Sequence, residues 1–189
     1  HNGNLTNAHA LKAELFNTDH RHINTESDSE VLLNVLAHEI ERTTRGLPLQ
    51  PHDLFAAVRN VHRRVKGSYA VIALIAGHGV LAFRDPFGIR PLCMGRADGS
   101  TLLASESVAL EGTGYHFERN VDPGEAVFVD LSGKVHAQQC ADHPRLNPCI
   151  FEFVYLARPD SVMDNISVYQ ARLNLGETLA KRVISTVPP

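Results

Sequence analysis

The chain has 189 residues, of which 43% are hydrophobic and 21% are charged, and its formal net charge is −3. This composition is typical of a globular protein with a sizeable core. The small negative charge leaves no basic surface for nucleic acid. No stretch approaches the run of about 18 apolar residues that a membrane helix needs, and no signal peptide is visible. We therefore expect neither nucleic acid nor a membrane as a partner.

Three helices are predicted in the first third of the chain, over residues 6–17, from Ser27 to Gly46 and from Pro51 to Gly67. Thr6 is a candidate cap of the first helix. Ser27 and Glu30 have the spacing of a capping box before the second helix. Apolar residues recur at helical period in each segment.

The period changes at residue 68, where strands begin. Residues 68–75 form an almost continuous apolar run, typical of a strand covered on both faces. A Gly77-His78-Gly79 turn and residues 80–83 complete a hairpin. Further strands are predicted at 101–104 and 126–130, and a helix begins near Ser105. Helices followed by hairpin-linked strands indicate an α+β fold with an antiparallel sheet.

The proline-rich segment 143–148 lacks either period and marks a domain boundary. Residues 149–156 beyond it are interpreted as extended. Residues 166–183 carry one apolar helix face, with small residues at Gly176 and Ala180 that permit close packing. We expect this last helix to belong to a second domain.

The three cysteines, Cys93, Cys140 and Cys149, are widely spaced and form no Cys-x-x-Cys pair. This odd number favours a reducing compartment over a disulfide framework, so we expect a cytoplasmic protein. The eleven histidines are scattered without acidic or cysteine partners at ligand spacing. No metal site is predicted.

The chain starts with His1, Asn2 and Gly3. Asn-Gly favours a tight turn with positive φ. It also places two hydrogen-bond donors side by side, the Asn2 side-chain amide and the Gly3 backbone N–H. Adjacent donors of this kind stabilise the oxyanion that develops during acyl transfer. A structural turn and a catalytic role are both open at this point.

Several segments resemble, in order, the amidophosphoribosyltransferase family, glutamine-dependent enzymes that begin purine synthesis. They are His1 to Leu5, Ser27 to Glu30, Gly67 to Ala70, Arg84 to Leu92, Ala157 to Ser161 and Ile166 to Arg172. The first two also fit other class II amidotransferases, whereas Ala-Arg-Pro-Asp-Ser is more specific to this family. The match runs over essentially all of the chain.

The resemblance implies an N-terminal-nucleophile (Ntn) hydrolase fold, an αββα sandwich of antiparallel sheets. This N-terminally truncated class II glutaminase domain would span residues 1–142, with a linker at 143–150. Residues 151–189 would begin an α/β type I phosphoribosyltransferase domain.

The family's oxyanion hole falls on Asn2 and Gly3. Its glutamine-specificity aspartate, which binds the substrate's α-ammonium, falls on Asp28. A carboxylate suits that role because it accepts charge-assisted hydrogen bonds from an amine. Ser27 or Asp28 is also a candidate helix cap, and the two roles are compatible. The Arg84 to Leu92 segment is interpreted as turn structure, and Arg158 as either a phosphate ligand or part of an ordinary turn.

The family's nucleophile is a cysteine at the mature N-terminus that uses its own α-amine as base. It would precede His1, so the 189 residues alone are expected to be inactive. The family's Mg²⁺ would bind beyond Pro189. Some members carry an iron–sulfur cluster with one ligand at Cys149, but a cluster needs several thiolates, so an inert Cys149 is favoured.

The reaction that the resemblance implies uses ammonia from glutamine. It converts phosphoribosyl pyrophosphate to 5-phosphoribosylamine, pyrophosphate and glutamate. The implied partners are glutamine, phosphoribosyl pyrophosphate, purine nucleotide inhibitors and further copies of the chain in a homo-oligomer. The alternatives are the glutaminase domain of another class II amidotransferase, or a non-catalytic nucleotide-sensing module with the same fold.

Overall fold

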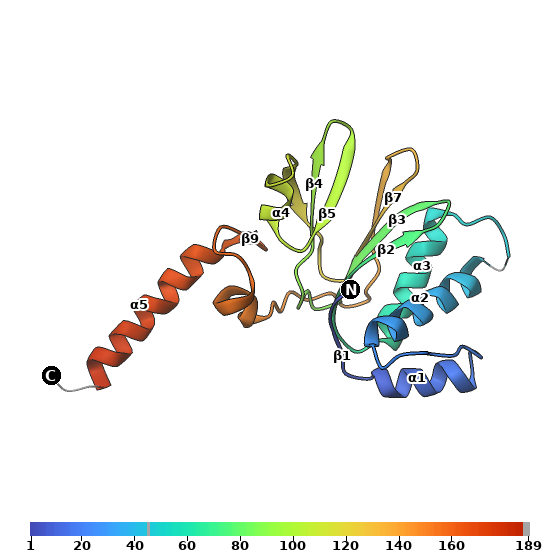
Figure 1. The fold of residues 1–189 in the computed structure, drawn as a ribbon, viewed down its shortest axis with the longest axis horizontal. Helices are drawn as coiled ribbons and strands as arrows, with labels where there is room; N and C mark the ends of the chain where they lie inside the picture. The colour runs from blue at the N-terminus through green and yellow to red at the C-terminus, as the bar shows by residue number, and fades with distance from the viewer. Residues whose placement is uncertain (45, 187–189) are drawn as a thin grey trace.

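The computed structural model of the protein describes residues 1–44 and 46–186 (Figure 1). Its helices are α1 (Ala8–Asn17), α2 (Asp28–Thr44), α3 (Pro51–Arg64), α4 (Ser107–Glu111) and α5 (Val168–Thr186), with a π-helical turn η1 (Glu152–Leu156). Its strands are β1 (Asn2–Leu5), β2 (Gly67–Ile75), β3 (Gly79–Arg84), β4 (Cys93–Ala97), β5 (Ser100–Ala104), β6 (His116–Asn120), β7 (Glu125–Asp130), β8 (Val135–Gln139), β9 (Val162–Met163) and β10 (Ile166–Ser167). The last three residues of the predicted second domain, 187–189, lie outside the described residues.

The larger sheet has the strand order β1-β2-β3-β7-β8, and all its pairs are antiparallel. Helices α1, α2 and α3 cover one face of this sheet (Figure 1). Side chains from these helices and from the sheet form the main core, which includes Leu15, Leu32, Leu54, Val58, Tyr69, Leu81 and Phe83. The amphipathic patterns of α2 and α3 therefore correctly predict which sides of these helices are buried.

The smaller sheet, β5-β4-β6, packs on the other face of the larger sheet. A second core joins Ala70, Ala82 and Val127 of the larger sheet to Leu92, Met94 and Val121. The short helix α4 lies on the far side of the smaller sheet, where Leu110 is fully buried beside Gly95. The layers are helices, sheet, sheet and helix, so the predicted α+β sandwich of antiparallel sheets is confirmed.

Strand β2 is covered on both faces only in its first half, contrary to the prediction. Ile72 is 47% exposed and Leu74 is 79% exposed. The smaller sheet reaches only the Ala70 end of this strand, so the alternate residues beyond it face solvent. An apolar run shows that both faces of a strand can be buried, but it does not show whether another element covers them.

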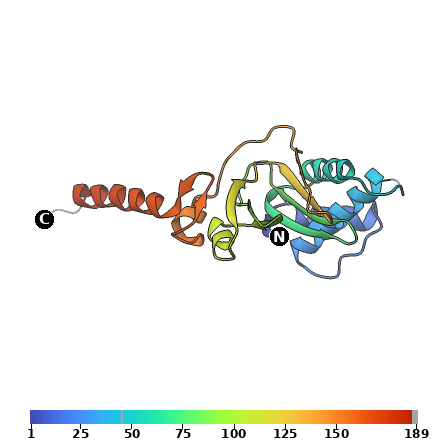
Figure 2. The same ribbon diagram turned by 90° about the horizontal axis from the view of Figure 1, so that it is seen from above.

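The C-terminal segment was predicted to be extended over residues 149–156, and this is wrong. Residues 152–156 form η1, which is followed by the β9–β10 hairpin and α5. An apolar run without a clear period does not distinguish a strand from a helical turn. Phe153, Ala157, Met163 and Val168 form a small separate core. Beyond it, α5 extends away from the sheets in both views (Figures 1 and 2).

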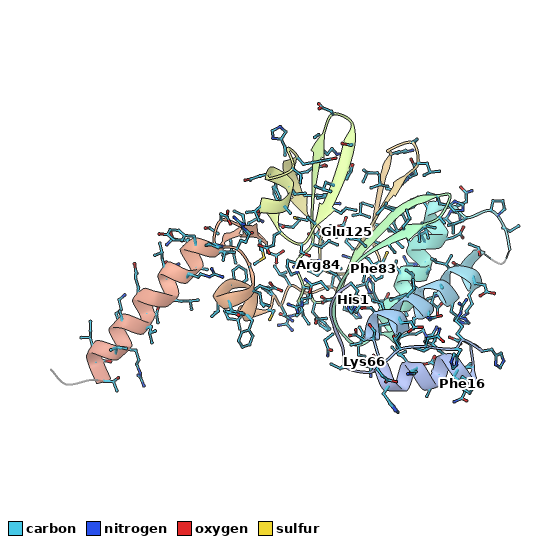
Figure 3. The ribbon with its side chains drawn as sticks, viewed as in Figure 1. His1, Phe16, Lys66, Phe83, Arg84 and Glu125 are labelled. Carbon is cyan, nitrogen blue, oxygen red and sulfur yellow. The ribbon has the colours of Figure 1, made fainter. Side chains whose placement is uncertain are left out.

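Buried polar contacts join this segment to the sandwich. The Arg84 guanidinium, at the end of β3 nearest the segment (Figure 3), donates to both carboxylate oxygens of Asp164, at 2.8 and 2.9 Å. Arg90 donates to Glu152 at 2.6 Å, and the Ser161 hydroxyl donates to Glu106 at 2.6 Å.

None of the helices in residues 1–44 and 46–186 combines the length and the hydropathy of a membrane-spanning segment.

Candidate functional site

Asn2 and Gly3 lie in a strand, so the alternative interpretation of this dipeptide as a tight turn is wrong. They belong to β1, which pairs antiparallel with β2, Asn2 opposite Ala70 and Gly3 opposite Tyr69. Gly3 does have the expected positive φ, at 144°. A Cβ atom at this position would lie 2.0 Å from the Ser68 carbonyl oxygen, so only glycine allows the two strands to approach this closely.

The hydrogen bonds of Tyr69 determine which way the Gly3 N–H points. The Tyr69 carbonyl accepts from the Asp85 N–H at 2.8 Å, and the Tyr69 N–H donates to the Asp85 carboxylate at 3.3 Å. Both groups of Tyr69 thus face away from β1. Gly3 and Tyr69 are therefore a non-hydrogen-bonded pair, and the Gly3 N–H points outward from the edge of the sheet.

Asp28 lies at that same edge. Its Oδ2 atom accepts the Leu5 N–H at 3.0 Å. Leu5 is two residues after Gly3, so its N–H points to the same side and lies about 7 Å further along the strand. The edge of β1 thus holds an outward N–H at Gly3 and a carboxylate near Leu5. Asp28 is the first residue of α2, where the helix dipole stabilises negative charge.

The predicted capping box before α2 does not form. The Ser27 hydroxyl accepts the Ser29 N–H at 3.3 Å, so Ser27 caps the helix by itself. Glu30 turns back to the preceding loop, where its carboxylate accepts the N–H groups of Asn24 and Thr25 and the Thr25 hydroxyl. Thr6 does not cap α1 either, because the cap position is Asn7. With Ser27 as the cap, the Asp28 carboxylate is available to β1.

His1 and Ser29 are at the site as well, and the sequence interpretation did not include them. His1 Nδ1 lies 2.9 Å from the Ser29 hydroxyl and 3.8 Å from Asp28 Oδ1. The His1 side chain is only 6% exposed. It borders a cavity of about 210 Å³ between α2 and the second half of β2. His1 and Ser29 are 28 positions apart in the sequence, so no short motif indicates that they are in contact.

The Asn2 side chain is at the exposed end of β1. Among the described residues it takes part in no side-chain hydrogen bond, so its amide donors are available to a ligand. Asn2 and Gly3 lie three and two residues before Leu5, whose N–H donates to Asp28. The structure therefore brings all three sequence-predicted site residues to one edge of the larger sheet.

A buried polar network lies directly behind β1. The Asp85 carboxylate is fully buried and accepts the N–H groups of Tyr69, Phe87, Ile89 and Arg90. Burial raises its pKa above the ordinary value, although these four donors oppose the rise. Burial also raises the pKa of Tyr69. This network holds the Arg84 to Leu92 turn, as the structural interpretation of that segment predicts.

His62 completes the network on its helical side. Its Nδ1 accepts from the Tyr69 hydroxyl at 2.8 Å, and its Nε2 donates to the Gly124 carbonyl at 3.2 Å. Both contacts suit the neutral ring, which has one donor and one acceptor. Burial lowers the pKa of His62 to about 4, so the ring is neutral at physiological pH. We assign it a structural role.

The cysteines are free and lie in three different places. Burial raises the pKa of Cys93 to about 12 and that of Cys140 to about 11, so neither forms a reactive thiolate at neutral pH. Cys149 is half-buried at the start of the C-terminal segment. In the part of the chain that the structure describes, no three metal-binding side chains gather. The three separated cysteines therefore do not supply the several thiolates that an iron–sulfur cluster needs.

Arg158 belongs to an ordinary turn. Its guanidinium pairs with Asp160 at 2.8 Å, and its backbone N–H donates to Glu106. The neighbouring Ser161 is buried, and its hydroxyl donates to the same glutamate. These contacts account for the Ala157 to Ser161 segment without a phosphate ligand.

Known proteins resemble this chain along its whole length. It is 52% identical over 187 residues to an amidophosphoribosyltransferase of Pasteurella multocida, and 51% identical over 188 residues to one of Escherichia coli. Each alignment covers 97% of this chain and 37% of the relative, so the chain spans little more than a third of the length of these curated relatives.

Two solved structures are also similar to this chain. The glutamine phosphoribosylpyrophosphate amidotransferase of B. subtilis, complexed with ADP and GMP, superposes with a TM-score of 0.80 at 32% identity. The match covers 95% of this chain and 37% of that one. A structure described as the allosteric regulatory enzyme of purine biosynthesis matches with a TM-score of 0.81 over 99% of this chain and 37% of its own.

The profile of the family described as "Glutamine amidotransferase domain" matches residues 1–112. This range contains β1, Asp28 and the buried network behind them. The chain belongs to the glutamine amidotransferase domain family.

Proposed function

We propose that this chain is the glutaminase part of an amidophosphoribosyltransferase. In this proposal glutamine is hydrolysed at the edge of β1, and the ammonia converts phosphoribosyl pyrophosphate to 5-phosphoribosylamine and pyrophosphate. The observation that carries the proposal is that Asn2, the outward N–H of Gly3 and the carboxylate of Asp28 lie along one edge strand of the sheet.

Each group has a distinct role in glutamine hydrolysis. The substrate's α-ammonium binds Asp28, and its carboxamide reaches along β1 towards Gly3. A thiolate attacks the carboxamide carbon, and the Asn2 amide and Gly3 N–H donate to the oxygen that becomes negative. Collapse of this intermediate releases ammonia and leaves a thioester, which water hydrolyses to glutamate. Neither Cys93 nor Cys140 is suited to supply this thiolate, because both are buried with raised pKa values.

The phosphoribosyl half of the proposal is supported by the extent of the similarity. The amidotransferase profile ends at residue 112, yet the identity with amidophosphoribosyltransferases continues over 97% of the chain. A glutaminase domain of another class II amidotransferase would be followed by a different module. We therefore favour residues 1–142 as the glutaminase domain, 143–150 as a linker and 151–189 as the start of the phosphoribosyltransferase domain.

The same proposal extends to partners and location. It includes phosphoribosyl pyrophosphate, Mg²⁺ bound by residues other than those described, purine nucleotides as inhibitors, and a homo-oligomer. The nucleotides in the B. subtilis structure are consistent with such inhibitors. Three free cysteines are consistent with the cytoplasm.

The test is a kinetic assay of the protein expressed from its complete reading frame. Wild type should release glutamate from glutamine and form pyrophosphate from phosphoribosyl pyrophosphate. Asn2→Ala should lower kcat for glutamine by about 10²–10³-fold, because one oxyanion donor is lost. Asp28→Asn should raise KM for glutamine. Both variants should retain synthesis with added ammonia, which bypasses the glutaminase site. A wild type that hydrolyses no glutamine would refute the proposal.

A further inference from the structure

The Asp28 carboxylate has one occupied oxygen and one open oxygen. Oδ2 accepts the Leu5 N–H at 3.0 Å. Oδ1 accepts no hydrogen bond from the described residues. The Nδ1 atom of His1 lies 3.8 Å from it. The Asp28 side chain is 24% exposed, so a ligand can reach it. An amine that binds Asp28 therefore meets Oδ1, and the direction of Oδ1 determines how well it binds.

The His1 ring is fixed beside this open oxygen. Its side chain is buried, and its Nδ1 lies 2.9 Å from the Ser29 hydroxyl. A serine hydroxyl both donates and accepts, so this contact forms with either tautomer of the ring. Ser29 follows Asp28 in the first turn of α2, and its own N–H is held by the Ser27 hydroxyl. The ring is thus attached to the same helical turn that carries the carboxylate.

Strand β1 and the residue just before it contact this helical turn at two points. Leu5 binds Asp28 through its backbone, and His1 binds Ser29 through its side chain. Gly3 lies between them with its N–H pointing to the same edge. The two contacts set both the rotation of the carboxylate and its distance from the Gly3 donor.

We propose that His1 and Ser29 are positioning residues that hold Asp28 Oδ1 towards the α-ammonium of the amino-acid substrate. This inference rests on the proposed glutaminase function. His1 and Ser29 touch no reacting atom in it. They act through Asp28, so their removal weakens recognition of the ammonium and leaves the acyl-transfer step intact.

The test uses the protein expressed from its complete reading frame and two substrates. One substrate is glutamine, and the other is 5-amino-5-oxopentanoate, which is glutamine without its α-amino group. Ser29→Ala should raise KM for glutamine about tenfold, with kcat within about twofold. The same variant should leave kcat/KM for 5-amino-5-oxopentanoate unchanged. Because both substrates are assayed with the same preparation of the variant, any loss of folded protein lowers both rates equally and cancels in their ratio.

Conservative variants sharpen the result. Ser29→Thr keeps the hydroxyl and should restore the wild-type KM. His1→Asn places a carboxamide nitrogen near the position of the ring Nδ1 and should be less impaired than His1→Ala. Ser100→Ala is the matched control, since it removes a hydroxyl that hydrogen-bonds Ala97 and Tyr115 in the smaller sheet.

Three outcomes are distinct. A higher KM for glutamine alone supports the inference. An unchanged KM in Ser29→Ala, or an equal loss with both substrates, overturns it while the proposed function stands. A wild type without glutaminase activity overturns the proposed function, and the positioning role fails with it.

Discussion

Arg84 and Asp164, 80 positions apart, form a buried bidentate ion pair. The Arg84 side chain is 1% exposed and that of Asp164 is 8% exposed. The remaining N–H groups of Arg84 donate to the backbone carbonyls of Gly88, Arg90 and Val121, so all five donors are used. Asp164 lies in the β9–β10 turn. This pair therefore anchors the C-terminal segment to the end of β3.

Removal of Asp164 should destabilise the protein strongly. In Asp164→Ala the buried guanidinium keeps its charge without a partner, and we expect the free energy of unfolding to fall by about 3–5 kcal/mol. Urea denaturation measures this change. Asp160→Ala is the control, because the Arg158–Asp160 pair is exposed and exposed pairs contribute little. Equal midpoints for the two variants would contradict the assigned role of Arg84.

Stability should depend on pH through His62. The pKa of this ring is about 4 in the folded protein and about 6.5 when unfolded, so the unfolded state binds more protons between these values. The contribution is fully present above pH 6.5 and is lost as pH falls towards 4. We expect a loss of about 2–3 kcal/mol between pH 7 and pH 4.5.

The raised pKa of Asp85 acts in the opposite direction, so the His62 contribution must be isolated by difference. Urea denaturation of wild type and His62→Gln at both pH values provides that difference. The variant lacks a group that titrates in this range, and its unfolding free energy should change less with pH. Parallel pH profiles of the two proteins would show that His62 is not the group responsible.

Gly3→Ala should abolish most glutaminase activity. The new Cβ would lie 2.0 Å from the Ser68 carbonyl, which forces β1 away from β2 and displaces the Gly3 donor. We expect kcat for glutamine to fall by at least about 10²-fold. Gly99→Ala is the matched control. Gly99 also has positive φ, at 78°, but nothing lies within 4 Å of its Cβ position. It should cost about 1 kcal/mol of stability and leave the kinetics unchanged.

The cysteines should differ in their reaction with iodoacetamide at pH 7.5. Cys93 and Cys140 are buried and have raised pKa values, so alkylation at these positions should be slow. Cys149 is only half-buried and should react first. Peptide mass spectrometry distinguishes the sites, and urea should make all three reactive. Labelling of Cys93 as fast as that of Cys149 in the native protein would contradict the structure.

Many local elements were predictable from sequence, because α1, α2, α3 and α5 carry a helical period and the β2–β3 hairpin carries two apolar runs around a glycine turn. Strand β4 was missed because Gly95 and Arg96 interrupt its apolar residues, and β6 was missed because most of its residues are polar. Both strands are defined by their partners in the smaller sheet. Periodicity describes a segment, whereas strand pairing depends on contacts made elsewhere in the chain.

The site was predictable only in part. Donor chemistry pointed to Asn2 and Gly3, and the family resemblance pointed to Asp28. The contacts of His1 with Ser29 and of Arg84 with Asp164 were not predictable, because their partners are 28 and 80 positions away. Such long-range pairs depend on the tertiary fold of the chain.

At Gly3 and at Gly67 the strands β1 and β2 approach so closely that no side chain larger than a hydrogen atom fits between them. Beyond the contact at Gly3, a Cβ at Gly67 would lie 2.3 Å from the Asn4 carbonyl oxygen. A single methyl group at either place already exceeds the available gap, so substitution there cannot adjust the separation of the strands by small steps. Gradual variation in the geometry of this edge must therefore come from groups on its open side.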